Sequence, residues 1–161
     1  MKNCFRSRKK KCRIGSYYIA MAGKLVSKLT KRECFSLNKG DSLLTAAKAM
    51  NQYNVGAMPV LDQNGSVVGI ISERDIARHI GQDDFTANMQ VDNIMSKNVI
   101  TCDTNVSVSE LMETMTINKI RHMVVMEQER LLGMVSIGDV VNHIIEQYKE
   151  ENEKLRNFIN N

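Results

Sequence analysis

The sequence is poor in the features that mark membrane proteins and disulfide-linked proteins. None of its apolar runs approaches the roughly 20 residues that a membrane-spanning helix needs, so we expect no membrane protein. Its four cysteines, at positions 4, 12, 34 and 102, include no C-x-x-C pair, which argues against a disulfide framework or a zinc site. Reduced thiols in a cytosolic compartment fit this spacing better, so we predict a cytoplasmic protein.

Motifs of catalysis are also missing. The chain has no G-x-x-x-x-G-K-[ST] loop for phosphoryl transfer, no G-x-S-x-G nucleophile elbow and no H-E-x-x-H metal motif. His79 and His143 stand 64 residues apart at equivalent places of a repeat described below, and this equivalence favours a structural role over metal binding. We therefore predict no enzyme, no catalytic cofactor and no metal site.

Acidic residues are absent from the first 32 positions, which carry eleven Lys or Arg. The remaining residues carry eleven basic and all eighteen acidic groups, so the body is negative although the whole chain is +4. A basic tail of this kind fits a solvated extension, a nucleic-acid arm or an organelle-targeting peptide. We favour the extension, expect no binding of nucleic acid, and keep organelle targeting as the alternative to the cytoplasm.

The body consists of an internal repeat. Residues 42–63 (SLLTAAKAMNQYNVGAMPVLDQ) align with 107–128 (SVSELMETMTINKIRHMVVMEQ) at an offset of 65. The offset falls to 64 further on, where GIISERD (69–75) aligns with GMVSIGD (133–139). At 161 residues the chain is one ordinary domain or two very small ones, so one supersecondary unit has been used twice.

Each unit predicts the order strand, helix, strand, strand, helix. Ser42 and Ser107 are candidate helix N-caps, and apolar residues at i, i+3, i+4 and i+7 follow each of them. Two short apolar runs come next, separated in the first unit by the hairpin signal Asn64-Gly65. A second helix begins at Ser72 and at Ser136. Because neither unit has a large apolar surface, we expect the two to associate about a pseudo-twofold axis as an α/β (α+β) protein.

The paired segments VGAMPVLDQNGSVVGIISERDIAR and IRHMVVMEQERLLGMVSIGDVV, with the lead-in VDNIMSKNVIT, resemble a tandem cystathionine-β-synthase (CBS) domain pair. The resemblance covers about residues 24–145. It implies a regulatory module that binds AMP, ADP, ATP, NAD or S-adenosylmethionine between its strands and helices. It divides the chain into a basic, disordered extension (1–23), two CBS repeats (24–90 and 91–145) and a C-terminal helical extension (146–161).

The repeated G-h-h-S-x-x-D segment is the candidate ribose site. A serine at a helix N-terminus and an aspartate in the first turn can receive a ribose diol, so we assign this role to Ser72, Asp75, Ser136 and Asp139. Ser at the N-cap with Asp three residues later is also an ordinary capping arrangement. The serines can serve both purposes.

Phosphate and adenine contacts are assigned from the resemblance. Arg121, His122 and Arg74 are the phosphate candidates, because arginine offers bidentate donors to phosphate. The first unit has Gly56 and Ala57 where the second has Arg121 and His122, so the two sites should differ in strength or in ligand. The adenine pocket is assigned to Ser36, Leu37, Gly56, Ala57, Met58, Ile100, Thr101 and Met123.

The segment after the second repeat has the a/d pattern of a coiled coil in Val141, Ile145, Tyr148, Asn152, Leu155 and Ile159. A helix folded back on its own domain is the alternative. The resemblance implies a homodimer, which this helix could reinforce. We therefore predict a regulatory, energy-sensing module that binds an adenine nucleotide and modulates an unknown partner or its own assembly. The alternatives are a nucleic-acid-binding regulator that uses the basic tail and an interaction subunit without a ligand.

Overall fold

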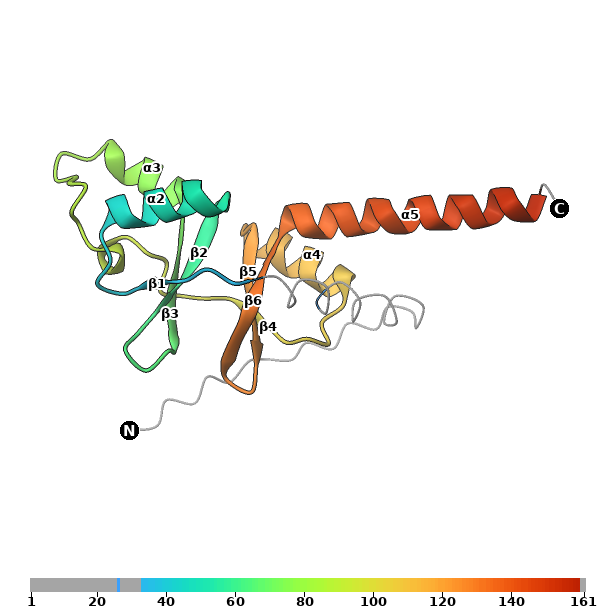
Figure 1. The fold of residues 1–161 in the computed structure, drawn as a ribbon, viewed down its shortest axis with the longest axis horizontal. Helices are drawn as coiled ribbons and strands as arrows, with labels where there is room; N and C mark the ends of the chain where they lie inside the picture. The colour runs from blue at the N-terminus through green and yellow to red at the C-terminus, as the bar shows by residue number, and fades with distance from the viewer. Residues whose placement is uncertain (1–25, 27–32, 160–161) are drawn as a thin grey trace.

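The computed structural model describes residue 26 and residues 33–159, and residues 1–25, with the predicted basic extension, lie outside this part. Two three-stranded sheets stand next to each other, each with its own pair of helices (Figure 1). The elements run in the order β1 (Leu37–Asn38), α2 (Leu43–Tyr53), β2 (Ala57–Leu61), β3 (Val67–Ser72), α3 (Glu73–Ile80), the short 3-10 helix η1 (Val91–Asn93), β4 (Thr101–Cys102), α4 (Val108–Ile117), β5 (His122–Glu127), β6 (Arg130–Ser136) and α5 (Ile137–Ile159). The predicted order of elements in each repeat is confirmed.

The two sheets have the same topology. β1 is parallel to β2 and β4 is parallel to β5, while β2–β3 and β5–β6 are antiparallel hairpins. The register shifts between Val60 and Leu61 in the first sheet and between Val125 and Met126 in the second, at positions 65 residues apart. The repeat read from the sequence is therefore a structural repeat as well. Gly65, with φ 78°, supplies the left-handed residue of the predicted first hairpin.

Serine caps begin the helices as predicted. The side chains of Ser42 and Ser107 accept hydrogen bonds from the backbone N–H of Thr45 and Glu110, and Glu110 completes a capping box. The apolar faces of α2 and α4 are buried at the predicted 3.6-residue period in Leu43, Ala46 and Met50, and in Val108, Leu111 and Met115.

The hydrophobic cores exchange the segments that begin each repeat. Val26, at the start of the first repeat, is buried in the core built by α4, β5 and β6 of the second. Ile94 and Met95, at the start of the second repeat, are buried in the core of the first. A bridge between Ile70 and Ser96 fixes the latter segment to β3. The sequence boundary at residue 90 therefore does not coincide with the boundary between the two cores.

Helix α5 begins on the second sheet and then extends far beyond the body (Figure 1). Its first turns are held by the buried Val140 and His143, whereas every residue from Tyr148 to Ile159 is exposed. The alternative of a helix folded back on its own domain is therefore wrong. In the part of the chain that the structure describes, no helix has the length and apolar character to cross a membrane.

Candidate functional site

Two cavities lie between the repeats, with volumes of about 280 and 480 Å³. We name them the first cavity and the second cavity. Ligand pockets in proteins commonly have about 300–1,000 Å³, so the second cavity has the size of a small-molecule site and the first lies just below this range. The first is lined by Glu33, Cys34, Phe35, Asn54, Val55, Gly56, Ala57, His122, Gly133, Met134, Ser136 and Asp139. The second is lined by Gly56, Ala57, Ile70, Ser72, Glu73, Arg74, Asp75, Arg78, Ser96, Lys119, Ile120, Arg121, His122, Ser136, Ile137 and Gly138.

The two linings correspond through the repeat. Residues 54–57 line the first cavity, and residues 119–122, which follow them by 65 positions, line the second. Likewise Ser136 and Asp139 of the first cavity correspond to Ser72 and Asp75 of the second. Each cavity thus combines the start of a strand from one repeat with the start of a second helix from the other. This crossing cannot be seen in either repeat alone.

The ribose candidates form two nearly identical capping boxes. In the first repeat, the Asp75 Oδ2 atom accepts hydrogen bonds from the Ser72 N–H (2.9 Å) and the Ser72 hydroxyl (2.6 Å). In the second, the Asp139 Oδ2 atom accepts the same two bonds from Ser136, also at 2.9 and 2.6 Å. The capping role considered for these residues is thus confirmed. A ribose role for the same side chains stays a prediction, and the boxes hold both carboxylates in fixed positions at the cavities.

A backbone hydrogen bond in each repeat joins the second helix to the strand that faces it. The Glu73 N–H donates to the Gly56 carbonyl at 3.0 Å, and the Ile137 N–H donates to the Arg121 carbonyl at 2.9 Å. These bonds fix the first turn of α3 beside the start of β2, and that of α5 beside the start of β5. The residues nearest to the cavities are therefore held by backbone contacts as well as by side chains.

Positive charge is concentrated at the second cavity. Arg74 and Arg121, both predicted phosphate ligands, line it together with Arg78 and Lys119. Each cavity has two acids in its lining, Glu33 and Asp139 in the first and Glu73 and Asp75 in the second, but among the described residues that line the first there is no Lys or Arg. The two cavities therefore offer different chemistry, the second to an anion and the first to a neutral or cationic group.

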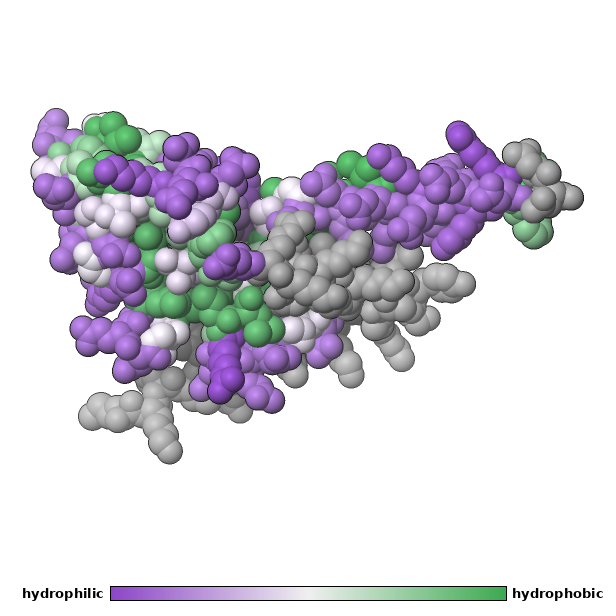
Figure 2. Space-filling model, in the orientation of Figure 1, coloured by the Kyte–Doolittle hydropathy of each residue, from purple (hydrophilic) through white to green (hydrophobic). Residues whose placement is uncertain are grey.

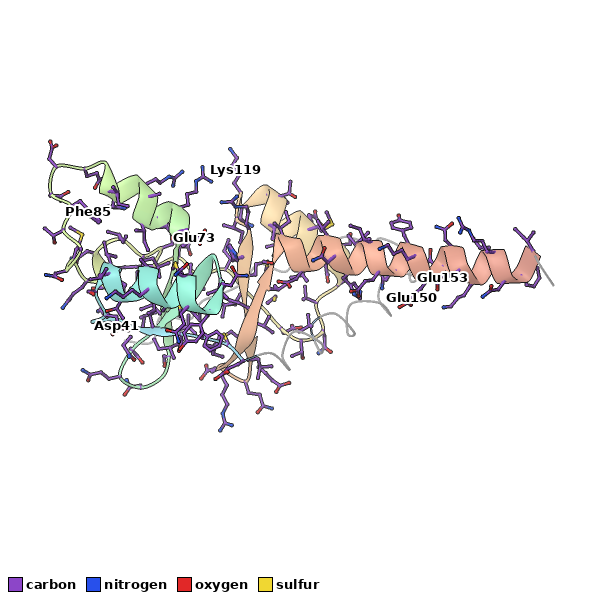
Figure 3. The ribbon with its side chains drawn as sticks, turned by 45° about the horizontal axis from the view of Figure 1, so that its top comes forward. Asp41, Glu73, Phe85, Lys119, Glu150 and Glu153 are labelled. Atoms are coloured by element: carbon purple, nitrogen blue, oxygen red, sulfur yellow. The ribbon has the colours of Figure 1, made fainter. Side chains whose placement is uncertain are left out.

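Arg78 and Lys119 were missed by the sequence analysis, although each had a signal. Arg78 follows Arg74 by four residues and thus lies on the same face of α3. Lys119 precedes Arg121 by two residues. The sequence shows that a helix ends near this position, but it does not show in which direction the side chains of the following turn point. Figure 3 shows Lys119 and Glu73 at the boundary between the repeats, where both line the second cavity.

His122 lines both cavities and is half-buried. Burial lowers the pKa of its imidazole, and the positive charge of Arg121 lowers the pKa further, while the carboxylates of Asp139 and Glu73 act in the opposite direction. An added Cβ at Gly56 would lie 3.6 Å from the Glu73 Oε2 atom and 3.9 Å from the His122 Nε2 atom. A side chain at position 56 would therefore occupy the space between these two groups.

The residues assigned to adenine lie in different places. Gly56 and Ala57 line both cavities. Leu37 and Met58 are buried in the first core and Met123 in the second, with Ile100 half-buried against it. Ser36 and Thr101 are exposed, and none of these six lines the first or the second cavity. The apolar lining comes from neighbouring positions that the sequence analysis did not select, chiefly Phe35, Val55, Ile70, Ile120 and Met134.

The two equivalent histidines of the second helices have different surroundings, because His79 contacts its own helix whereas the buried His143 leaves its Nε2 atom without a hydrogen-bond partner among the described residues. The His79 Nδ1 atom lies 2.9 Å from the Asp75 carbonyl oxygen, and His143 is buried in α5. Over the described residues, no group of three or more His, Cys, Asp or Glu is placed to hold a metal ion.

The chain is similar in sequence to known proteins that contain CBS domains. The CBS domain matches residues 26–82 and 91–146, one copy for each repeat. The CBS domain-containing protein CBSX3, mitochondrial, of Arabidopsis thaliana is 37% identical over 124 residues, which are 74% of this chain and 60% of that protein. The chain thus spans less than two thirds of that relative. The CBS domain-containing protein YhcV of Bacillus subtilis is 30% identical over 105 residues, or 65% of this chain and 74% of that protein.

Solved structures show the same architecture. A CBS-domain containing protein from Agrobacterium tumefaciens has a TM-score of 0.73 and 34% identity, over 80% of this chain and 98% of that one. The CBS domain pair of protein MJ0100 has a TM-score of 0.70 and 25% identity, over 80% and 98% of the two chains. That pair was crystallised in complex with 5′-methylthioadenosine and S-adenosyl-L-methionine. The predicted arrangement of two packed repeats is therefore confirmed.

Proposed function

Because the chain belongs to the CBS domain family, a regulatory type of domain, we propose that it is a regulatory module that binds an adenine nucleotide of the AMP, ATP or NAD type. The observation that carries this proposal is the group of four cations at the second cavity, beside the capping box of Ser72 and Asp75. A phosphate needs cationic donors, and a ribose diol needs a fixed acceptor. The second cavity offers both within one space between the repeats. The proposed function is ligand binding and includes no catalytic step.

The proposed orientation follows from the lining. The phosphate lies against Arg121, with Arg74 and Lys119 as further donors, because guanidinium groups bind phosphate oxygens in pairs. The ribose lies against Asp75 at the start of α3. The base lies against the apolar Ile70 and Ile120, which also line the cavity.

For the first cavity we propose an adenosine ligand without phosphate. Its described lining offers Asp139 for a ribose and Phe35 and Met134 as apolar surface, but no Lys or Arg for a phosphate. Glu33 and Asp139 would attract a cationic group such as a sulfonium. The ligands of the MJ0100 pair are of this phosphate-free class, which supports the proposal.

Regulation requires that the ligand bind two states of the protein unequally. Helix α5 provides a route for this, because Ile137 and Gly138 line the second cavity and Asp139 lines the first, while the same helix continues out of the body. We propose that a bound nucleotide alters the direction of α5, and through it the affinity for a partner or for a second copy in a homodimer.

Titration calorimetry with AMP, ADP, ATP, NAD, adenosine and S-adenosylmethionine tests the proposal. Arg121→Ala should weaken AMP binding by about tenfold or more, since a charge-assisted hydrogen bond contributes roughly 1.5–3 kcal/mol. Adenosine, which lacks the phosphate, should bind the variant as it binds the wild type. Arg130→Ala removes the same charge at the far end of the β5–β6 hairpin and serves as the matched control. Equal losses for AMP and adenosine would remove Arg121 from the phosphate role.

For location we propose the cytoplasm. Import into an organelle is the alternative that the basic, acid-free residues 1–32 and the mitochondrial name of the Arabidopsis relative favour. Fractionation of cells that express the tagged full chain separates the two, because co-purification with mitochondria would overturn the proposal.

A further inference from the structure

The projecting part of α5 carries an apolar stripe that the described part of the chain does not cover. In heptad notation, Ile145, Asn152 and Ile159 stand at a positions, and Val141, Tyr148 and Leu155 at d positions. All six are exposed, and Leu155 exposes 62% of its surface. Phe158, at the neighbouring g position, exposes 86%. The stripe is therefore a continuous surface along about five turns of helix rather than one isolated residue.

The stripe lies on the side of α5 that points away from the protein's own body. The residues that anchor the helix, Val140 and His143, stand at c and f positions of the same heptads. At 100° per residue, the c and f positions lie roughly opposite the a/d stripe. The described part of the body thus holds α5 by one side and does not cover the opposite side.

The rest of the projecting surface is strongly polar. Figure 2 shows mainly hydrophilic residues on the visible face of α5, with hydrophobic atoms near its start and near its end. Figure 3 places Glu150 and Glu153 on the projecting part of the helix, and they occupy f and b positions. An apolar stripe bordered by charges is typical of a helix that pairs with another helix, because pairing removes the contiguous apolar surface from water.

Charges beside the stripe select both the partner and its direction. The e positions carry the bases Lys149 and Arg156, and the g position between them carries Glu151. In a parallel pair, a g residue of one helix faces the next e residue of the other, so Glu151 faces Arg156 of the second copy twice by symmetry. In an antiparallel pair, e positions face e positions and g positions face g positions, so Lys149 and Arg156 would repel each other.

We propose that the a/d stripe of α5 pairs in parallel with the same stripe of a second copy of this chain. The stripe complements itself in charge only in the parallel arrangement. Asn152 supports the same choice, because a single asparagine at an a position meets its equivalent across a parallel pair and fixes the register. A parallel pair also places the two bodies at the same end of the paired helices, so that both sets of cavities adjoin the start of one shared coiled coil.

Sedimentation velocity over a dilution series of the full chain tests the proposal. The wild-type protein should be a dimer that dissociates reversibly into monomers on dilution. Leu155→Ala should raise the dimer dissociation constant at least about tenfold, because it removes buried apolar surface from both helices. Leu155 lies far outside the body, so the thermal unfolding of the body, followed by circular dichroism, should not change. A monomer at every concentration, or a dimer indifferent to Leu155→Ala, would overturn the proposal and assign the stripe to another partner.

Charge reversal tests the direction. Arg156→Glu should raise the dissociation constant by about two- to tenfold, because it places two negative charges at each crossing. Lys154→Glu, at an outward c position, makes the same change of charge and is the matched control. The double variant E151R/R156E should restore the wild-type value. If Arg156→Glu tightens the dimer instead, the helices are antiparallel and the proposal fails. Nucleotide binding at the cavities is measured separately, so either result leaves the proposed ligand function to its own test.

Discussion

The paired capping boxes allow one proposed ribose site to serve as the control for the other. Asp75 and Asp139 make the same hydrogen bonds to Ser72 and Ser136, at 2.9 and 2.6 Å in both repeats. Asp75 lines only the second cavity, and Asp139 lines only the first. Replacing each by alanine should therefore have a similar effect on stability and a different effect on ligands.

The expected magnitudes follow from these contacts. Each alanine variant keeps the serine N-cap but loses the carboxylate half of the capping box, which should lower the free energy of unfolding by about 1 kcal/mol. Asp75→Ala should also weaken AMP binding by about 10- to 100-fold, since hydrogen bonds to a charged group contribute roughly 1.5–3 kcal/mol. Asp139→Ala should leave AMP binding unchanged, because it does not line the cavity that holds the four cations.

Urea unfolding and titration calorimetry on the two variants give both quantities. S-adenosylmethionine supplies the reciprocal arm, because it should lose affinity for Asp139→Ala and not for Asp75→Ala. The reasoning is refuted if AMP loses the same affinity in both variants, since a general loss of rigidity would then explain the effect. It is also refuted if Asp75→Ala loses stability while it binds AMP like the wild type, which would leave the aspartate a helix cap alone.

Two further predictions concern residues at the second cavity. The pKa of His122 is lowered by burial and by Arg121, so the unfolded chain takes up a proton more readily than the folded one. Stability should therefore be full above about pH 6.5 and fall on acidification, as urea unfolding at about pH 7.5 and about pH 5.5 would show. His122→Gln should flatten this difference, and an unchanged pH dependence would contradict the assignment. Lys119 has φ 53°, in the left-handed region, where Asn54 (φ 52°) occupies the equivalent place of the first repeat. Lys119→Asn should raise the free energy of unfolding by up to about 1 kcal/mol, because asparagine tolerates this conformation better. Lys119→Asn should also weaken the binding of AMP more than the binding of adenosine. If the variant binds both ligands with the affinities of the wild type, Lys119 is not part of the phosphate site.

The local elements could be predicted from the sequence because their causes are local. Ser42 and Ser107 cap helices, the apolar positions of α2 and α4 follow the helical period, and Asn64-Gly65 closes a hairpin. The internal repeat also indicated a contact between distant parts of the chain, which a single sequence without a repeat seldom does. Two copies in register indicated two similar units that pack together, and the structure has this arrangement.

The composition of the cavities could not be predicted in the same way, because it depends on how the repeats cross. From the sequence alone, each cation and each aspartate could be assigned only within its own repeat. In the structure, Arg121 of the second repeat shares a cavity with Asp75 of the first, while Asp139 faces the start of β2. The exchange of Val26 and Met95 between the cores was hidden for the same reason. Hydrophobic patterns show that a residue is buried, and they do not show in which core.

The adenine assignments show a related difference. Met58 and Met123 lie at the expected strand positions, but alternate residues of a strand point to opposite sides, and these two point into the cores. Their neighbours Ala57 and His122 line the cavities instead. A shift of one residue along a strand thus separates a core position from a cavity position. The family resemblance located the segment without resolving this choice.

A crystal structure of the full chain grown with AMP tests the central claim most directly. The account predicts the nucleotide in the second cavity, with its phosphate within hydrogen-bonding distance of Arg121 and its ribose at the Asp75 carboxylate. AMP bound in the first cavity, with its phosphate away from Arg121 and Arg74, would contradict the account. So would a second cavity that stays without nucleotide at a concentration that calorimetry shows to be saturating.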